Sequence, residues 1–358
     1  MPALRQSSHH FRRAFAWLRA WTAICVLGVT GCDDPKKEAQ LRWREEEVSA
    51  KETDLIKREQ RLLEDRRAAE TVQAQIKQAQ EALAAREKVL ADNEAKVKQA
   101  KVAWETKLKR GPAPSTSSER IIVVDPATDE VYFEHNADKR GPIASTTKIM
   151  TALLLVEAGD LDKELIVEDG DTKCAPVRIG LKVGEKYPRI NLLTALLVKS
   201  SNDIAQALAR DNAGSLEAFA EKMNNRAKEL GCANTLYINP HGLPPINGQP
   251  EPYCTARDLA RIAKEADKRQ EIRDIVKLKN YRFAMASGKT VALENTNHVL
   301  RTSPFCDGMK TGFTEAAGHC LVATGEREGK RRIVVVLNGT STSVWKDAQA
   351  LLEWAVKF

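Results

Sequence analysis

The chain has 358 residues, of which 42% are hydrophobic and 29% are charged, with a formal net charge of +7. This length allows one large domain plus a further segment. The modest basic charge comes with no patch of basic and aromatic residues, so no nucleic-acid partner is expected. The six histidines are scattered apart from a pair within the first ten residues. None has the spacing of metal ligands, so we expect neither a metal site nor a cofactor.

The N-terminus has the pattern of a lipoprotein signal. Four arginines precede an apolar run at 20–29 that is too short to span a bilayer stably. Small residues before Cys32 resemble a bacterial lipobox, so residues 1–31 are predicted to be a signal peptide and Cys32 the lipidated first mature residue. An ordinary signal peptide with an incidental cysteine is the alternative. Lipid on Cys32 would hold the protein on a membrane of the bacterial cell envelope, facing the periplasm or cell wall. The acidic pair at 33–34 resembles an inner-membrane retention signal but does not decide which membrane.

A charged helical spacer is predicted to complete the segment 32–110. From 36 to 110 the chain lacks glycine and proline, and an apolar or alanine residue recurs every seven positions from Leu41 to Trp104. The companion core position, three residues on, is largely charged. Two structures fit this pattern: a loose coiled coil that gives weak homo-oligomers, or a single solvated helix with many ion pairs. Residues 111–118 are rich in proline and serine and predict a flexible linker.

Residues 119–358 predict a mixed α/β domain of the α+β kind. Strand-like runs at 120–125 and 131–135 form a predicted hairpin, and helical patterns extend from 145 to about 267. Strand-like runs return at 310–311, 319–324 and 332–337, before an amphipathic helix at 343–356. Strands at both ends with helices between them favour one antiparallel sheet, with the terminal strands side by side, flanked by helices and an all-helical lobe.

The strongest chemical signal is a serine and a lysine at S-x-x-K spacing. Ser145 precedes a helical run, and Lys148 lies one turn later on the same face. A serine hydroxyl needs a nearby base, and burial or a helix start lowers a lysine pKa enough for this task. The spacing alone is weak evidence, because Ser343 and Lys346 have it too.

Two downstream motifs give the first match its weight. Ser200 and Asn202 form S-x-N between two apolar helical runs, and Lys310, Thr311 and Gly312 form K-T-G before a strand. In this order the three motifs resemble those of penicillin-binding proteins and class A β-lactamases. Together with similar stretches at 239–243 and 255–260, residues 119–358 resemble the low-molecular-mass penicillin-binding proteins, the serine D-alanyl-D-alanine carboxypeptidases.

The resemblance implies a penicillin-binding fold with its active site between sheet and lobe. It implies that Ser145 forms the acyl-enzyme and Lys148 accepts its proton, while Ser200 and Asn202 assist from the lobe. Lys310 and Thr311 would bind the substrate's terminal carboxylate. The backbone N–H groups of Ser145 and of the residue after Gly312, here 313, would form the oxyanion hole.

Two positions depart from the family pattern. Phe313 follows K-T-G where the family often has histidine, and it adds to the substrate-binding set an aromatic ring that bears on substrate preference and acyl-enzyme lifetime. Ser201 stands where the family often has glycine. His241 belongs to a family-like N-P-H-G-L stretch and is expected to be structural. No E-x-x-L-N loop lies between the second and third motifs; the nearest stretch, 221–225, appears helical.

The predicted function is therefore a serine D,D-peptidase that cleaves the terminal D-Ala-D-Ala bond of peptidoglycan stem peptides and is inhibited covalently by β-lactams. The alternatives are a D,D-endopeptidase acting on cross-links, a β-lactamase, and a non-catalytic envelope tether. Cys25 would leave with the signal. That leaves five cysteines besides Cys32, an odd number, so at least one stays free or pairs between chains. Burial as small hydrophobic residues is favoured for each, and the pairing is left open.

Overall fold

The structure is a computed structural model, and it describes residues 35–245 and 248–358. The predicted signal peptide and Cys32 lie outside these residues. The chain divides into two units, Met1–Lys98 and Gln99–Phe358. Within the described ranges, no helix combines the length and apolar character needed to cross a membrane.

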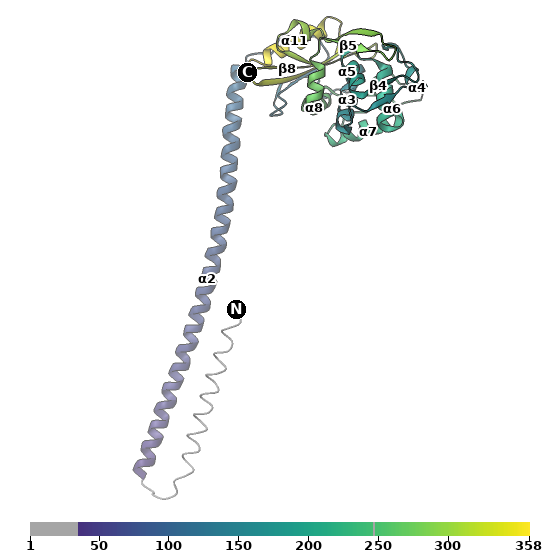
Figure 1. Cartoon of the computed structure of the whole chain (residues 1–358). Helices are drawn as coiled ribbons and strands as arrows, with labels where there is room; N and C mark the ends of the chain where they lie inside the picture. Colours follow the sequence, from purple (N-terminus) through teal and green to yellow (C-terminus); the bar gives the residue numbers. More distant parts are fainter. Residues whose placement is uncertain (1–34, 246–247) are drawn as a thin grey trace. The chain divides into compact units, whose positions relative to one another are not determined.

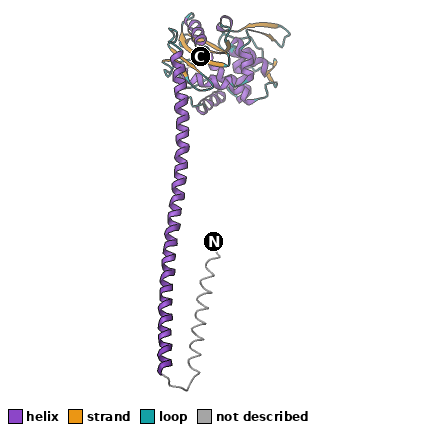
Figure 2. Ribbon diagram, turned by 90° about the vertical axis from the view of Figure 1, so that its left-hand side faces the viewer, coloured by secondary structure: helices purple, strands orange, loops and turns teal. Residues whose placement is uncertain are grey.

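The predicted spacer is the helix α2, Pro35–Lys109, of 75 residues. Figure 2 shows it as one uninterrupted helix. It has no glycine or proline after its first residue, and pairs such as Lys51–Glu47, at 2.7 Å, link successive turns. The large apolar heptad residues are exposed, from 52% for Ile76 to 68% for Val97. An uncovered stripe of this kind is compatible with both structures considered above.

The unit Gln99–Phe358 is built on one antiparallel sheet of five strands in the order β2-β1-β9-β8-β7. The strands are β1 (Arg120–Val124), β2 (Val131–His135), β7 (Cys306–Thr314), β8 (Gly318–Arg327) and β9 (Lys330–Gly339). The first strand therefore pairs with the last, as predicted. β7 pairs with β8 alone and forms an edge of the described sheet.

Both faces of this sheet are covered. Alternate β1 residues serve two clusters: Ile121 and Val123 pack with the C-terminal helix α11 (Ser343–Ala355), whereas Ile122 packs with the lobe. The helix α8 (Ala256–Asp267) lies on the lobe side, opposite α11 (Figure 1). The predicted antiparallel sheet flanked by helices is confirmed.

The helical lobe surrounds α3 (Lys148–Ala158), which packs against α5, α6, α7, α8 and α9. Two short hairpins, β3–β4 and β5–β6, were not predicted, because their strands are brief and partly exposed. The remaining elements are η1 (Ala144–Thr147), β3 (Glu164–Ile166), α4 (Asp169–Thr172), β4 (Lys186–Pro188), α5 (Arg189–Lys199), α6 (Asn202–Ala213), α7 (Leu216–Glu229), α9 (Gln270–Val276), β5 (Asn280–Ala284), β6 (Thr290–Glu294) and α10 (Val299–Thr302).

The predicted flexible linker 111–118 is tied down at both ends, which corrects its expected freedom. The carbonyl of Arg110 accepts a hydrogen bond of 3.2 Å from Trp354, and the Arg110 side chain is buried. At the other end, the backbone N–H and hydroxyl of Ser118 donate to the Asp347 carboxylate at 2.8 and 2.7 Å. The two partners, Trp354 and Asp347, both lie on α11, more than two hundred residues away in the sequence. The composition of the linker does not indicate either contact.

Candidate active site

The serine of the first motif lies on a short 3₁₀ turn, η1, and the lysine begins the helix that follows. This differs in detail from the single helix predicted from the sequence. The turn is tightly held, because Gly242 packs against it: a Cβ on this glycine would lie 1.9 Å from the carbonyl oxygen of Ala144. With a φ of 79°, Gly242 also adopts a conformation that other residues rarely take. The N-P-H-G-L loop therefore supports the turn that carries Ser145.

Lys148 is placed to act as a base toward Ser145. Its Nζ donates hydrogen bonds of 2.8 Å to Ser145 Oγ, 2.8 Å to Asn202 Oδ1 and 3.0 Å to the His241 carbonyl. The side chain is fully buried. Burial, together with the nearby charge of Lys310, lowers the pKa of Lys148 well below that of an ordinary lysine. A neutral amine at this position can accept the serine proton.

Ser200 and Asn202 enter the site at the break between α5 and α6. Ser200 ends α5 in a left-handed conformation with a φ of 71°. Asn202 begins α6 and holds the neighbouring loop, because its Nδ2 donates to the Pro176 carbonyl at 2.6 Å. The Asp203 carboxylate accepts backbone N–H groups from 179–181 in the same loop. The second motif therefore also fixes a loop beside the site.

The third motif brings a second buried lysine from the edge strand. Lys310 Nζ donates 2.9 Å hydrogen bonds to Ser200 Oγ and to the Thr311 carbonyl. Burial lowers the pKa of Lys310 to about 7. The Thr311 hydroxyl lies 2.6 Å from that of Thr296, in the loop after β6. Sheet and lobe thus meet through Lys310 and Ser200.

Gly312 allows the strand β7 to approach the nucleophile. A Cβ on Gly312 would lie 2.7 Å from the backbone nitrogen of Ser145 and 3.0 Å from that of Thr146, so a larger residue would displace the turn. Phe313 follows at the mouth of the site. Phe313 is 54% exposed, and its ring lies against that of His319, tilted by 33°, with 4.4 Å between centroids.

His241 contributes a backbone carbonyl that accepts a hydrogen bond from Lys148, a role that the sequence did not indicate. Its side chain is buried, and Nδ1 accepts a hydrogen bond from the Leu243 N–H at 3.2 Å. Burial and the nearby Lys148 lower the pKa of His241 to about 3, so the ring is neutral. Thr296, Asp203 and the Pro176 carbonyl were not identified from the sequence either. Asp203 directly follows S-x-N, so its position in the sequence was a signal that it belongs to the site. Thr296 and the Pro176 carbonyl are brought to the site only by the fold.

The competing S-x-x-K pair has another environment. Ser343 starts α11, and its Oγ accepts from the Thr340 N–H at 2.8 Å and lies 3.2 Å from Ser118 Oγ. These contacts tie Ser343 to the turn before α11 and to the end of the linker. The five cysteines in the described part of the chain form no disulfide; four are buried and Cys174 is half-buried. In those same residues, no group of three or more histidine, cysteine or acidic side chains has the geometry of a metal site.

The chain is similar to known proteins in both sequence and fold. Residues 107–341 match the peptidase family described as D-alanyl-D-alanine carboxypeptidase. The chain is 34% identical over 233 residues to D-alanyl-D-alanine carboxypeptidase DacF of Bacillus subtilis, covering 64% of this chain and 59% of that protein. It is 33% identical over 249 residues to D-alanyl-D-alanine endopeptidase of Escherichia coli, covering 67% and 78%. It therefore spans about three fifths of the first relative's length.

Solved structures give the same result for the fold. Penicillin-binding protein D2 from Listeria monocytogenes, in an ampicillin-bound form, superimposes with a TM-score of 0.60 and 32% identity. The match covers 68% of this chain and 99% of that one. The family match spans more than half of this chain and includes all three motifs. The chain therefore belongs to the D-alanyl-D-alanine carboxypeptidase family of serine peptidases.

Proposed function

We propose that the protein is a serine D,D-peptidase that cleaves the bond between the last two D-alanines of peptidoglycan stem peptides. One observation carries this proposal: a buried Lys148 amine with a depressed pKa lies 2.8 Å from the Ser145 hydroxyl. A second buried lysine, Lys310, faces the same site from the edge strand. The Lys148 amine serves as the base, and the Lys310 ammonium group binds the substrate carboxylate.

The contacts support a two-step reaction. Ser145 Oγ attacks the carbonyl carbon of the penultimate D-alanine while its proton passes to Lys148 Nζ. The backbone N–H groups of Ser145 and Phe313 are the proposed donors to the oxyanion. Because Ser200 Oγ accepts from Lys310, its own proton is free to pass to the departing amine. D-alanine leaves, and the proton held by Lys148 passes to Ser200 to replace the one that Ser200 gave up, so Lys148 is neutral again. Water then attacks the ester with Lys148 as base, which releases the shortened peptide and regenerates Ser145.

A D,D-endopeptidase is the second candidate, and the leaving-group side of the site favours it. An open hollow there is lined by Lys199, Thr296, His298 and Arg301, next to the Thr296–Thr311 pair. A cross-linked substrate keeps a carboxylate next to the scissile amide but carries a long side chain in place of a methyl group. Open space at this position accommodates that chain.

Incubation with a pentapeptide ending in D-Ala-D-Ala and with cross-linked muropeptides, followed by mass analysis, separates the two activities. Release of D-alanine from the pentapeptide alone assigns a carboxypeptidase. Cleavage of the cross-linked dimer to monomers assigns an endopeptidase. Cleavage of neither substrate contradicts both.

A β-lactamase is less well supported. β-Lactams are expected to acylate Ser145 and to act as covalent inhibitors, because rapid turnover needs a general base for water. The stretch 221–225 lies inside α7 and not in a loop beside the site. No carboxylate among the described residues makes a hydrogen bond to Ser145 or Lys148. A non-catalytic tether would not require two buried lysines in contact with serine hydroxyls, so these contacts disfavour that function.

The remaining segments are proposed to position this enzyme in the envelope. Lipidated Cys32 would anchor the chain to a membrane after removal of 1–31, and the spacer 32–110 with the linker 111–118 would carry the catalytic domain 119–358. At 1.5 Å per residue the helix α2 extends about 110 Å. Its exposed apolar stripe favours weak homo-oligomers at membrane density. The enzyme would thus act in the periplasm or cell wall.

A further inference from the structure

The turn that carries Ser145 has an unusual backbone at its start. Ala144 has a φ of 47°, a left-handed conformation that a residue with a side chain adopts only at a cost in free energy. The turn also begins without a side-chain cap. A backbone of this kind persists when the surrounding structure holds it in place. The contacts of the segment that leads into the turn therefore help to determine where Ser145 lies.

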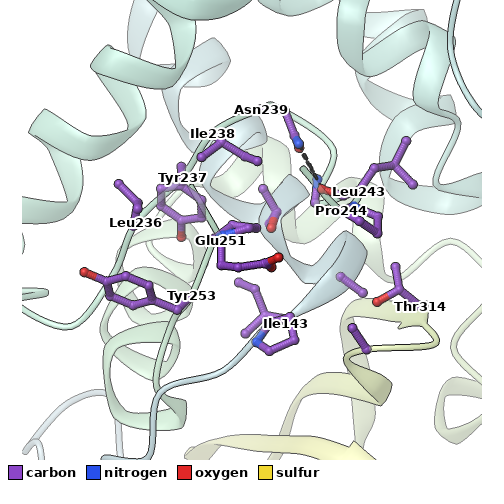
Figure 3. A pocket seen from close by; sticks show the side chains of 16 residues that line it. Ile143, Leu236, Tyr237, Ile238, Asn239, Leu243, Pro244, Glu251, Tyr253 and Thr314 are labelled. Carbon is purple, nitrogen blue, oxygen red and sulfur yellow. Dashed lines mark hydrogen bonds between the residues drawn. The ribbon is translucent and has the colours of Figure 1, made fainter. Parts of the chain in front are cut away.

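One side of this leading segment borders a hollow. Pro142 and Ile143 line a narrow space of about 30 Å³ together with residues of 236–244 and 251–253. Figure 3 shows Ile143 at one side of this space and Asn239 at the other. A side chain that borders a hollow loses the packing contacts that neighbouring atoms would give it there. The position of the segment therefore depends more strongly on its remaining contacts.

Arg120, the first residue of β1, supplies such contacts. Its Nη2 donates a hydrogen bond of 2.8 Å to the Pro142 carbonyl, and its Nη1 donates one of 3.2 Å to the Cys254 carbonyl. Gly141 and Cys254 also exchange two backbone hydrogen bonds, with lengths of 3.2 and 2.9 Å. One guanidinium group therefore holds both segments of this small β-bridge, directly before the turn.

The guanidinium group fits closely against Gly141. A Cβ on Gly141 would lie 2.8 Å from Nη1 and 2.9 Å from Cζ of Arg120, closer than real Cβ atoms approach. Gly141 is not among the glycines with a positive φ, so its backbone conformation does not require glycine. The close approach of Arg120 does. Arginine at 120 and glycine at 141 thus form a matched pair.

Arg120 is buried with little charge compensation. Its side chain is 2% exposed, and the Glu119 carboxylate lies 3.9 Å from Nε, beyond hydrogen-bond distance. That carboxylate also accepts hydrogen bonds from Lys139 and Asn338. A buried cation without a well-placed counter-charge is often less stable than an apolar residue of similar volume. A gain in stability therefore does not account for Arg120, whereas the position of the segment that it holds does.

We propose that Arg120 is a positioning residue for the nucleophile. By fixing the Pro142 carbonyl against β1, it determines how the chain enters η1 and where Ser145 Oγ and the Ser145 N–H lie. The hydrogen bonds of Arg120 go to backbone carbonyls, so it acts through the turn and not on the substrate. The inference rests on the proposed function. It implies that Arg120 affects the acylation step and leaves binding of the substrate carboxylate to Lys310 and Thr311 unchanged.

The test follows acylation of the full chain by a fluorescent penicillin in a stopped-flow instrument, which separates the dissociation constant of the first complex from the acylation rate constant. In Arg120→Met the rate constant should fall about ten- to hundredfold, the effect of losing hydrogen bonds from a charged group, while the dissociation constant stays within about twofold. Arg120→Lys keeps a cation and should recover part of the rate. Arg332→Met is the matched control, because Arg332 is equally buried in the same sheet but contacts Asp125 and Tyr132. It should lower the melting temperature and leave both constants unchanged.

Gly141→Ala perturbs the same contact from the other side and should slow acylation as Arg120→Met does. In the double variant the two losses should not multiply, because the methionine side chain can move away from the new methyl group. An unchanged acylation rate in either single variant, a loss confined to the dissociation constant, or losses that multiply in the double variant would overturn the positioning role. If Arg120→Met does not fold, the rate in Gly141→Ala decides. Failure of the proposed function has a different signature, since the wild type itself would then not be acylated.

Discussion

The hydroxyl oxygens of Thr296 and Thr311 lie 2.6 Å apart, which joins the loop after β6 to the strand that carries the third motif. The Thr311 hydroxyl is one of the two groups proposed to meet the substrate carboxylate. Thr296 thus determines which way that hydroxyl points, although nothing in the sequence pattern marked it.

Replacing Thr296 with valine tests this orienting role. The substitution keeps the shape and removes one hydrogen bond, an effect of about 0.5–1.5 kcal/mol, so kcat/KM on a free-acid peptide should fall about two- to tenfold through a higher KM. Serine at 296 retains the hydroxyl and should restore most of the loss. A valine variant with unchanged KM would exclude Thr296 from carboxylate binding.

The pH dependence follows from the two buried lysines. The kcat/KM profile reports the free enzyme, in which Lys310 must be protonated and Lys148 neutral. Because the pKa of Lys310 is lowered to about 7, kcat/KM should decline as the pH rises through this value and the cation is lost. The depressed pKa of Lys148 puts the rising limb at lower pH than an ordinary lysine would give.

Lys310→Met removes the charge at similar length and should abolish the declining limb. It should also reduce kcat/KM more on the free-acid peptide than on its C-terminal amide, since only the acid offers a carboxylate. A declining limb that persists in this variant, or equal losses on the two substrates, would assign the limb and the carboxylate to another group.

Asn202→Asp would place a carboxylate where the amide oxygen now accepts from Lys148 at 2.8 Å. A neighbouring negative charge raises a lysine pKa by about 1–3 units. The rate of Ser145 acylation at pH 7 should then fall roughly 10- to 1000-fold and recover in part at higher pH. Asn202→Leu, which removes both hydrogen bonds of the side chain without adding charge, should lose activity with no recovery. The same profile in both variants would exclude the electrostatic explanation.

Deleting 41–104 tests the spacer. Turnover of soluble peptides should stay nearly unchanged, because the described active-site contacts all lie within 120–340. Action on intact cell wall should decrease, because a shortened helix reduces the reach from the membrane. Unchanged muropeptide composition at equal protein level would argue against a spacer.

Analytical ultracentrifugation of the isolated segment tests its self-association. A monomer at high concentration would exclude the loose coiled coil and favour the single solvated helix.

Much of the fold follows from hydrophobic periodicity. The run of β-branched residues at 121–124 predicts a strand, because such side chains are enriched in strands. The seven-residue repeat from Leu41 to Trp104 predicts a helix, because side-chain direction repeats about every 3.6 residues there. The pairing of β1 with β9 follows from strands at both ends of the domain. The hairpin β5–β6 was missed because its strands bury little surface.

The motif residues were found in the sequence because each reacting group needs a particular residue type. The groups that orient them were not, since they act through the backbone or from distant loops. The His241 carbonyl and the Pro176 carbonyl could belong to any residue type. The docking of Ser118 on Asp347 joins positions 229 residues apart, which no local pattern encodes.

The central claim is that Ser145, activated by Lys148, is the nucleophile of a D,D-peptidase. Its most direct test is to incubate the full chain with a labelled penicillin, digest it and identify the labelled peptide by mass spectrometry, in parallel with D-alanine release from acetyl-L-lysyl-D-Ala-D-Ala. The account predicts label on Ser145 in the wild type, and neither label nor D-alanine release with Ser145→Ala. Label on Ser343, or D-alanine release by Ser145→Ala at the wild-type rate, would contradict it.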